Sequence, residues 1–570
     1  MPVPMDVMLT QAVDNWLQAN PQGKMNGTVP ARGDIKQGVV DLTRSIINAQ
    51  NAILPPKSPK MKVPDRLTNS QIARIIEKVE LVECISCSET RHEDELDMLG
   101  VYQESGENKG LYDTSDTALN QLVAAYNRMA GEKDENAVRH YLKRDLKAKK
   151  RCMDPDLIAV NNGVFDYKNK VLLPFSPDKI FLTKSNVDYN PNAKNITIHD
   201  PNDGTDWNVE DWVAGLSDDP ETVNLLWEIL GAINRPFVSW DRAIWAYSSE
   251  GCSGKGTFCE LLRNLRGKDN YASISLEEFA KEFHLESLIH ASAVICDEND
   301  VGTFIDKAAK LKAVITNDAL LINRKFKDPI TFQFYGLVVQ CLNEYPRIKD
   351  TSDSFYRRHL FIHFDKCFTG KEKKYIKDDY LSRKEVLEYV MYKTLNMDFY
   401  KLSEPKSCQL ALQDVKKSND PVREFVEDIL PQCRWDLLPF TFLYPIYKKW
   451  YAETNPSGTC LGRNKFIHQL YNVIQKNPEW MCESKDIPVH TKDRMDGPEP
   501  LILKYGLTDW MNPNYKGPDP HNTCLPALNV EYRGLLRRVP RNTQSPGYVV
   551  VAGNEPVPIT DNSLRRNNVD

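Results

Sequence analysis

The stretch Arg242–Leu265, RAIWAYSSEGCSGKGTFCELLRNL, contains an apolar run, a loop of small residues and an amphipathic run. This order predicts a strand, a phosphate-binding loop and a helix, because backbone N–H groups in a tight loop and at a helix N-terminus face an anion. The charge of Lys255 is expected to meet the β- and γ-phosphates. We assign ATP binding to Gly251, Cys252, Ser253, Gly254, Lys255, Gly256 and Thr257.

The loop departs from the pattern GxxxxGK[ST] at two positions. Ser249 stands where the first glycine is expected, and Gly256 follows the lysine. Thr257 is therefore the candidate Mg²⁺ ligand, directly or through water. The ending GKGT also resembles the loop of adenylate kinases, so a nucleotide-kinase function stays open as an alternative.

A second apolar run, in HASAVICDENDVG (290–302), ends in two carboxylates, Asp297 and Glu298. A strand that delivers acidic side chains beside a phosphate loop suits metal-assisted hydrolysis. We expect Asp297 to hold the Mg²⁺ hydration shell and Glu298 to act as general base on the attacking water.

Two further segments supply candidate catalytic groups. The strand pattern YGLVVQCLNEYP (335–346) ends at Asn343, whose amide suits a sensor of the γ-phosphate at the carboxyl end of a sheet. In TSDSFYRRHLFIHF (351–364), Arg357 and Arg358 precede another strand, and one of them is expected to reach a neighbouring subunit's ATP.

The segment between the second and third strands, KLKAVITNDALLINRKFKDPITFQF (310–334), predicts a helix and a hairpin turning at Lys327-Asp328-Pro329. Lys325, Phe326 and Lys327 are candidates for contact with single-stranded DNA. A hairpin with solvated lysines is the alternative. The basic run VRHYLKRDLKAKKR (138–151) predicts a helix whose charged face is exposed or touches DNA.

Taken in order, SEGCSGKGTF, AVICDEND, the hairpin segment, QCLNEYP and YRRHLFIHF resemble the superfamily 3 helicases, and most closely the C-terminal half of phage, plasmid and poxvirus primase-helicases. The preceding segment 160–191 is similar to the domain before the motor in that family. The resemblance implies a multidomain α/β protein with an AAA+ P-loop motor and a central parallel sheet. It also implies a hexamer that unwinds DNA with ATP and Mg²⁺ as cofactors, as replication initiator of a mobile element.

Three amphipathic patterns follow the motor, in NDPVREFVEDIL (419–430), FTFLYPIYKKWYAETN (440–455) and GRNKFIHQLYNVI (462–474). They resemble the winged-helix module of relatives, and Arg463 and Lys465 of the third are candidate DNA contacts. A module that only braces the ring is the alternative.

We expect five parts along the chain of 570 residues. They are a helical N-terminal region of unassigned role (1–97), the domain preceding the motor (98–220), the AAA+ motor (221–400), a winged-helix-like domain (415–510) and a Pro- and Arg-containing tail (511–570), flexible or origin-binding.

The composition of the chain restricts what the protein can bind and in which compartment it is expected. The net charge of -6 gives no general attraction to DNA, so cations that bind it must be concentrated locally. No apolar run has membrane-spanning length, and no secretory signal starts the chain. With 13 cysteines in no paired pattern, reduced thiols in the cytoplasm are expected, either of bacteria or of phage-infected cells. Cys84 and Cys87, with His92 nearby, form a weak zinc-site candidate.

The expected partners are single- and double-stranded DNA, including a replication origin, and further copies of the chain in a ring. A protein that binds an origin and uses ATP only as a switch is a third candidate, but Glu298 argues against it because a switch needs no positioned base.

Overall fold

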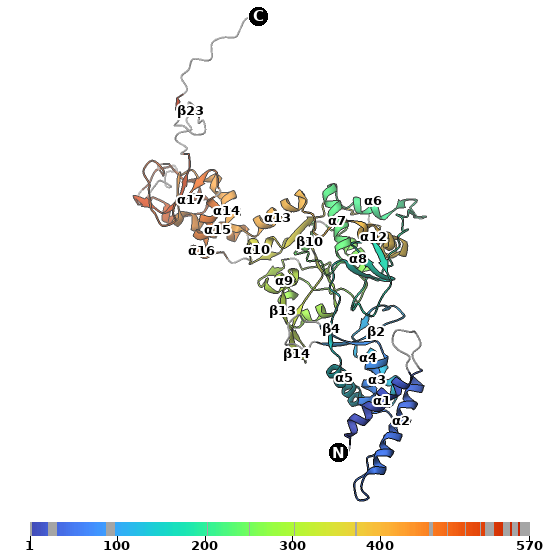
Figure 1. The fold of residues 1–570 in the computed structure, drawn as a ribbon. Helices are drawn as coiled ribbons and strands as arrows, with labels where there is room; N and C mark the ends of the chain where they lie inside the picture. Colours follow the sequence, from blue (N-terminus) through green and yellow to red (C-terminus); the bar gives the residue numbers. More distant parts are fainter. Residues whose placement is uncertain are drawn as a thin grey trace. The chain divides into compact units, whose positions relative to one another are not determined.

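The structure is a computed structural model in which the chain divides into two compact units, Met1–Leu412 and Gln413–Asp570 (Figure 1). Several sheets and many helices confirm the prediction of a multidomain α/β protein. The described residues are 3–20, 31–86, 97–201, 203–249, 251–300, 302–325, 327–350, 352–370, 373–454, 460–475, 477–495, 497–512, 515–518, 529–539, 548–549 and 557–558.

A four-stranded parallel sheet forms the centre of the first unit. Its order is β11-β15-β10-β17, made of Ala293–Cys296, Leu337–Leu342, Ala243–Tyr247 and His359–His363. Ala272 adds a parallel bridge to Val294 beyond β11. Apart from Gln340, His359 and His363 the strands are apolar, because both faces of a parallel sheet are covered.

Helices cover this sheet and share its hydrophobic core. α8 (Lys255–Arg266), α7 (Pro220–Ala232) and α12 (Lys384–Asn396) contribute buried side chains to one cluster that extends from Ile158 to Cys408. The meander β5-β6-β7 contributes to the same cluster through Phe165. The predicted boundary at residue 220 therefore does not separate two cores.

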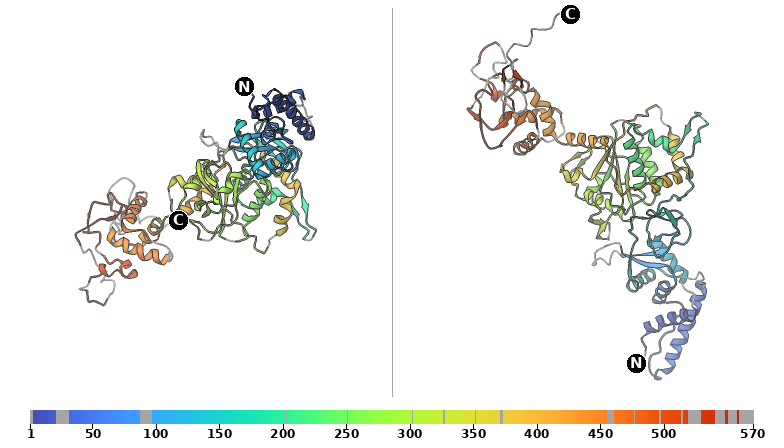
Figure 2. Two further views of the ribbon diagram at one scale, coloured as in Figure 1. Left: turned by 90° about the horizontal axis from the view of Figure 1, so that it is seen from below. Right: turned by 45° about the horizontal axis from the view of Figure 1, so that its top comes forward.

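The N-terminal part of this unit has a sheet and a core of its own. The sheet has the order β3-β2-β1-β4; helices α3, α4 and α5 pack against it, and α1 and α2, dark blue in Figure 2, lie beyond them. Thr68 and Gln71 form a capping box that starts α3. The bounds are α1 Met5–Ala19, α2 Arg32–Ile53, α3 Asn69–Val79, α4 Asp116–Tyr126, α5 Glu132–Asp145, β1 Val82–Ser86, β2 Met98–Tyr102, β3 Tyr112–Asp113 and β4 Ala148–Lys150.

Two predictions for this part differ from the structure. The predicted boundary at residue 97 cuts through the sheet, because β1 pairs with β2 from Val82–Val101 to Ile85–Met98. The basic run was predicted to be one helix, but α5 ends at Asp145 and residues Ala148–Lys150 form β4, parallel to β1. Pairing with an open edge of β1 outweighs the local helical preference of this lysine-rich segment.

The hairpin between the second and third strands of the motor is present as β13 (Ala319–Arg324) and β14 (Lys327–Gln333). The last strand pair before the turn is Arg324 with Lys327, so the predicted turn residues Lys327-Asp328-Pro329 belong to β14. Proline is compatible with that position because β14 pairs with β13 alone in this two-stranded sheet.

The remaining elements of the first unit are short connections and outer helices. They are β5 Leu157–Val160, β6 Gly163–Asp166, β7 Val171–Leu173, β8 Ile198–His199, β9 Asp206–Trp207, α6 Val209–Ala214, β12 Phe304–Ile305, α9 Ala309–Ile315, β16 Arg347–Ile348, α10 Asp353–Tyr356, α11 Lys374–Asp378 and α13 Lys406–Ser418, which reaches the second unit.

The second unit combines three longer helices and the short helix α17 with a small antiparallel sheet of order β18-β22-β19. The three predicted helices are present, and Tyr447 and Trp450 of the second lie in the core. The bounds are α14 Pro421–Ile429, α15 Phe440–Thr454, α16 Arg463–Ile474, α17 Pro500–Lys504, β18 Leu437–Pro439, β19 Trp480–Met481, β20 Val489–His490, β21 Glu531–Tyr532 and β22 Gly534–Arg537.

The predicted boundary at residue 510 differs from this arrangement. β22 lies in the segment assigned to the tail, yet it is the central strand of the sheet and buries Leu535 completely. Residues 531–537 therefore belong to the domain. Among the described residues, no helix is long and apolar enough to cross a membrane.

Candidate nucleotide site

The loop between β10 and α8 has the backbone of a phosphate cradle. Gly254 adopts φ 88° directly before the helix, and a Cβ there would lie 2.8 Å from Leu216 Cδ2, so both conformation and space favour glycine. Gly251 and Gly256 would meet nothing within 4 Å, so the loop faces open space on that side. Phe368 N–H donates to the Cys252 carbonyl at 3.0 Å and holds the loop from outside.

Lys255 is the first residue of α8 and is 8% exposed. Its ammonium donates to Ser248 O at 3.4 Å and Ser253 Oγ at 3.3 Å, both neutral oxygens. Burial lowers the pKa of Lys255, because the charged form loses hydration. A phosphate at the N-terminus of α8 would supply the opposite charge, so these residues fit the phosphates of a nucleotide.

The carboxyl end of β15 lies next to this loop. Ser248 N–H donates to the Leu342 carbonyl at 3.1 Å, and Asn343 follows Leu342 immediately. The Asn343 side chain is exposed. Because β15 lies between β10 and β11, the segment containing Asn343 lies between the phosphate loop and the carboxylates that follow β11.

The two carboxylates after β11 have different surroundings. Asp297 binds Arg263 of α8 through both oxygens, at 2.6 and 3.1 Å. Hydrogen bonding to Arg263 holds the pKa of Asp297 below its usual range. Glu298 is exposed, and the next residue, Asn299, is buried and donates to Gln340 Oε1 at 3.0 Å, which fixes the turn.

The pairing of Arg263 with Asp297 was not foreseen from the sequence, because it joins a helix to a strand end with no local spacing signal. An Asp297 paired in this way must still have a free lone pair if it is to bind hydrated Mg²⁺. Each carboxylate oxygen has two lone pairs, so a guanidinium on both oxygens still leaves acceptor capacity for a hydrated ion. Thr257, half-buried in the first turn of α8, and Asp297 are therefore residues that fit Mg²⁺.

The two arginines before β17 also differ. Arg358 donates to the Ser354 carbonyl of its own turn, whereas the Arg357 side chain is exposed. Both precede β17, and β17 runs parallel to β10 with His359 level with Ala243 and His363 level with Tyr247. The arginines thus lie at the amino-terminal ends of the parallel strands and the phosphate loop at their carboxyl ends, separated by about 13 Å along the strands.

The candidate DNA contacts lie away from this loop. Lys325 is exposed at the hairpin turn, whereas Phe326 and the side chain of Lys327 lie outside the described part of the structure. Arg463 and Lys465 are exposed in the first turn of α16. Cys84 is buried, and Cys87 and His92 fall outside the described residues.

Three family models match consecutive segments of the chain. The model described as D5 N terminal like matches residues 89–208. A family of unknown function (DUF5906) matches residues 246–358, which contain the phosphate loop, the carboxylates and the arginines. The model described as Poxvirus D5 protein-like matches residues 417–497.

Solved structures with detectable similarity include two of the NrS-1 C terminal region. The A form apo structure is 12% identical, covers 66% of this chain and 81% of its own, and has a TM-score of 0.36. An apo structure of residues 305–718 of that protein is 12% identical, covers 65% and 80%, and has a TM-score of 0.37. The three family models, rather than these structures, relate the chain to known proteins.

Proposed function

We propose that this chain, which belongs to the D5-type primase-helicases of superfamily 3, is an ATP-driven DNA helicase that works as a ring, as replication initiator of a phage, plasmid or genomic island. The resemblance stated from its motifs is confirmed by the D5 N terminal and Poxvirus D5 models. A single observation carries the motor function. The phosphate loop, the segment containing Asn343 and the acidic pair Asp297 and Glu298 follow three adjacent parallel strands at one edge of the sheet.

Each group then has a defined role in ATP hydrolysis. Lys255 and the loop N–H groups bind the β- and γ-phosphates, and Mg²⁺, held by Thr257 and through water by Asp297, would supply charge neutralisation between those phosphates. Glu298 accepts a proton from the attacking water, and its exposure leaves it accessible to that water. Asn343 donates to the γ-phosphate or orients the water.

Arg357, at the amino-terminal ends of the strands, makes hydrolysis depend on the ring. Arg357 is too far along the sheet to reach its own phosphate loop, so it acts on the ATP of the neighbouring subunit. Arg358 holds the turn through Ser354 and positions its neighbour. A planar, permanent cation delivered in trans stabilises the charge of the transferring phosphoryl group.

The second unit supplies double-stranded DNA contacts in this proposal. Three helices and a small antiparallel sheet support a winged-helix-like domain, with the first turn of α16 in the major groove. Arg463 and Lys465 would then reach phosphates or base edges.

Strand displacement on tailed duplexes tests the proposal. The chain should separate the strands in the presence of ATP and Mg²⁺, and Lys255→Ala should lower both DNA-stimulated ATP hydrolysis and unwinding by more than about 100-fold, as loss of a phosphate-positioning charge does. Lys281→Ala, an exposed lysine of the same unit, serves as the matched control. Full hydrolysis by Lys255→Ala would end the motor assignment.

A further inference from the structure

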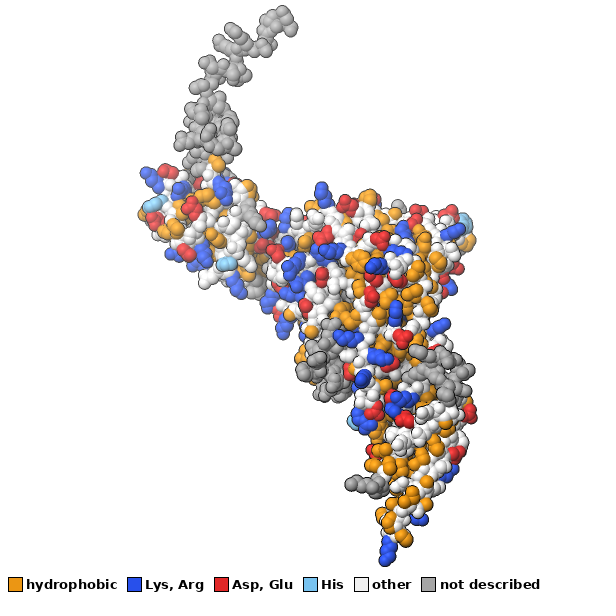
Figure 3. Space-filling model, viewed as in Figure 1, with side chains coloured by type: hydrophobic (Ala, Val, Ile, Leu, Met, Phe, Trp, Pro, Cys, Tyr) orange, Lys and Arg blue, Asp and Glu red, His pale blue; other side chains and the backbone are white. Residues whose placement is uncertain are grey.

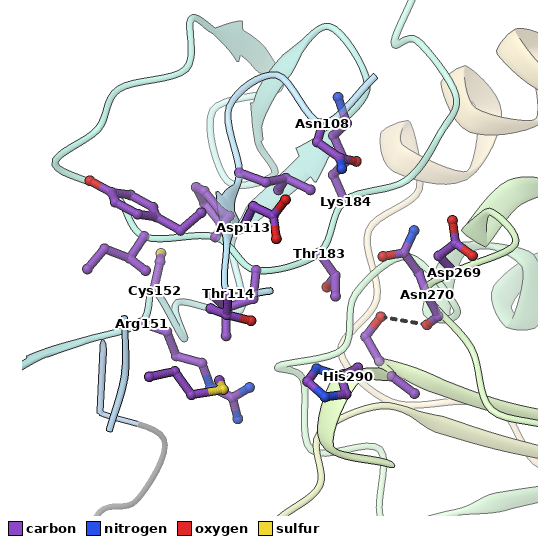
Figure 4. Close-up of a pocket in the computed structure, with 18 of the residues that line it drawn as sticks. Asn108, Asp113, Thr114, Arg151, Cys152, Thr183, Lys184, Asp269, Asn270 and His290 are labelled. Atoms are coloured by element: carbon purple, nitrogen blue, oxygen red, sulfur yellow. Dashed lines mark hydrogen bonds between the residues drawn. The ribbon is translucent and has the colours of Figure 1, made fainter. Parts of the chain in front are cut away.

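A cavity of about 780 Å³ lies in the first unit near the amino-terminal ends of the parallel strands, whereas the phosphate loop lies at their carboxyl ends (Figure 4). One wall contains Arg151 and Cys152, which directly follow β4. Another contains Ser292 and Tyr335, which precede β11 and β15 at the amino-terminal edge of the sheet. Its volume is within the roughly 300–1,000 Å³ of ligand sites. The cavity is therefore separate from the candidate nucleotide site.

An aromatic and guanidinium cluster forms part of the lining. The Arg151 guanidinium lies over the rings of Phe237 and Tyr335, with its central carbon 5.5 and 5.4 Å from the two centroids. The rings themselves are 5.7 Å apart. Unstacked nucleic-acid bases bind to this combination, because aromatic faces and guanidinium planes both stack on a base whatever its sequence.

The rest of the lining is polar and carries both signs of charge. Asn108, Asp113, Asn270 and Asp269 surround the cavity in Figure 4 and provide amide donors and carboxylate or carbonyl acceptors. Lys184 and Arg151 also line the cavity and balance part of this acidic charge. The amide and carboxylate groups can hydrogen-bond the edges of a base, and the rings beside Arg151 can stack on it, so the lining suits a base.

A basic strand leads directly into this cavity. All three residues of β4 are exposed, and β4 is the edge strand of its sheet. Lys147, Lys149 and Lys150 lie on this strand or just before it, and Lys149 is paired with Glu83 at 2.8 Å. Figure 3 shows basic side chains following one another over the region of β4 and α5. In a chain of net charge -6, such a local run is a candidate contact for a phosphate backbone.

We propose that the β4 edge and this cavity together form a binding site for single-stranded nucleic acid, with backbone phosphates along Lys147 and Lys150 and one base inserted beside Arg151. Phosphate contacts hold the strand in position, and the cavity takes up the unstacked base. This site deepens the proposed function by adding a contact for DNA outside the motor pore, and it rests on that function only in taking DNA as the partner.

Nucleotide-free binding of a fluorescein-labelled single-stranded oligodeoxynucleotide to the full chain tests the phosphate contacts. Lys147→Ala with Lys150→Ala should weaken binding several-fold at low salt. It should also reduce the slope of log K against log salt by about 1.4, since each phosphate contact contributes about 0.7 for single strands. The control Lys57→Ala with Lys60→Ala removes the same charge from an exposed segment of the N-terminal part. Equal slopes for the two double variants would overturn the site.

The inserted base is tested with oligonucleotides that carry 4-thiothymidine or an abasic position. Irradiation should cross-link the thiobase to Tyr335 or Phe237 peptides, and Arg151→Lys should keep the salt slope but lose the difference between normal and abasic strands, because lysine retains the charge without the plane. Cross-links confined to other segments would overturn the insertion. If a free nucleoside monophosphate competed for the site as strongly as the unlabelled strand does, the proposal of a polymeric ligand would be overturned.

These measurements contain no ATP, so they are separate from the test of the motor. Wild-type binding and cross-linking together with absent unwinding would count against the proposed helicase and leave this site standing. Normal unwinding with unchanged binding by the Lys147 and Lys150 variant would count against this site alone.

Discussion

Arg263 connects the helix that follows the phosphate loop to the carboxylate that follows β11. Its guanidinium binds both oxygens of Asp297, and it lies 3.3 Å from Glu260 on its own helix. The contact fixes the orientation of Asp297 relative to α8, on which Lys255 and Thr257 lie. Arg263 is therefore a positioning residue for the proposed Mg²⁺ site.

Arg263→Gln is expected to destabilise the first unit by about 1 kcal/mol at neutral pH, a modest value because both side chains remain partly exposed to solvent. Pairing lowers the pKa of folded Asp297 below that of an unfolded aspartate. The stabilisation is therefore present above about pH 4 and is lost as the pH falls through the folded pKa. Thermal unfolding of both proteins between pH 7 and pH 3.5 measures this difference.

Arg44→Gln is the matched control, since Arg44 pairs with Asp41 on an exposed helix face where half of each side chain is accessible. It should change the unfolding temperature less than Arg263→Gln. An Arg263→Gln protein as stable as wild type at pH 7 would show that the pair contributes nothing.

At the scale of elements, the hairpin β13–β14 is the proposed contact of the motor with single-stranded DNA. Lys325→Ala with Lys327→Ala should reduce the stimulation of ATP hydrolysis by DNA several-fold and leave basal hydrolysis unchanged, because the phosphate loop is made by other segments. The assay compares turnover with and without an oligonucleotide. Lys307→Ala, an exposed lysine before α9, is the control, and unchanged stimulation would remove the hairpin from the DNA path.

The helix α16 is the corresponding element of the second unit. Arg463→Ala with Lys465→Ala should weaken binding of duplex DNA and reduce the salt slope by about 1.8, at about 0.9 per phosphate contact. Lys448→Ala with Lys492→Ala removes two exposed charges elsewhere in that unit and provides the comparison. Identical slopes would favour a domain that only braces the ring.

The order of the motor elements could be predicted because each carries its own local pattern. An apolar run before a glycine-rich loop specified β10 and α8, and an apolar run before Asp297 specified β11. The hairpin was predicted as an element. Its turn was misplaced because Pro329 was interpreted as a turn residue, whereas it lies within strand β14.

Long-range pairing explains what the sequence could not predict. The contact between Arg263 and Asp297, the extension of the sheet by β4 and the return of β22 to the second unit all join segments distant in sequence. Local spacing contains no information about such partners. Phe326 and the side chain of Lys327 lie outside the described residues, so their proposed contact with DNA stays a prediction.

At the scale of the whole molecule, the proposed ring would have to supply Arg357 from a neighbouring subunit, because Arg357 and the phosphate loop lie at opposite ends of the strands. Lys255→Ala and Arg357→Ala proteins should each be inactive alone. When they are mixed, hydrolysis should return in part, because an Arg357 from one subunit meets an intact loop of another. ATP turnover of the mixture against each variant alone is the measurement.

Glu298→Gln subunits provide the complementary mixture. Equal amounts of this variant should inhibit wild-type subunits by more than the twofold expected from dilution, since one inactive site interrupts the ring. Activity that falls only in proportion to dilution, with no recovery in the first mixture, would indicate independent monomers.

The central strand β22 joins the core of the second unit only after a long stretch of chain. Strands β19 and β22 pair with each other but are separated in sequence by a long segment between Met481 and Gly534, which contains β20, α17 and β21. This segment itself contributes Met495, Leu501, Ile502 and Trp510 to the core, so only its exposed residues can change without disturbing the packed helices. In the proposed replication initiator, exchange of those exposed residues would change a recognition surface and leave the core of the second unit in place.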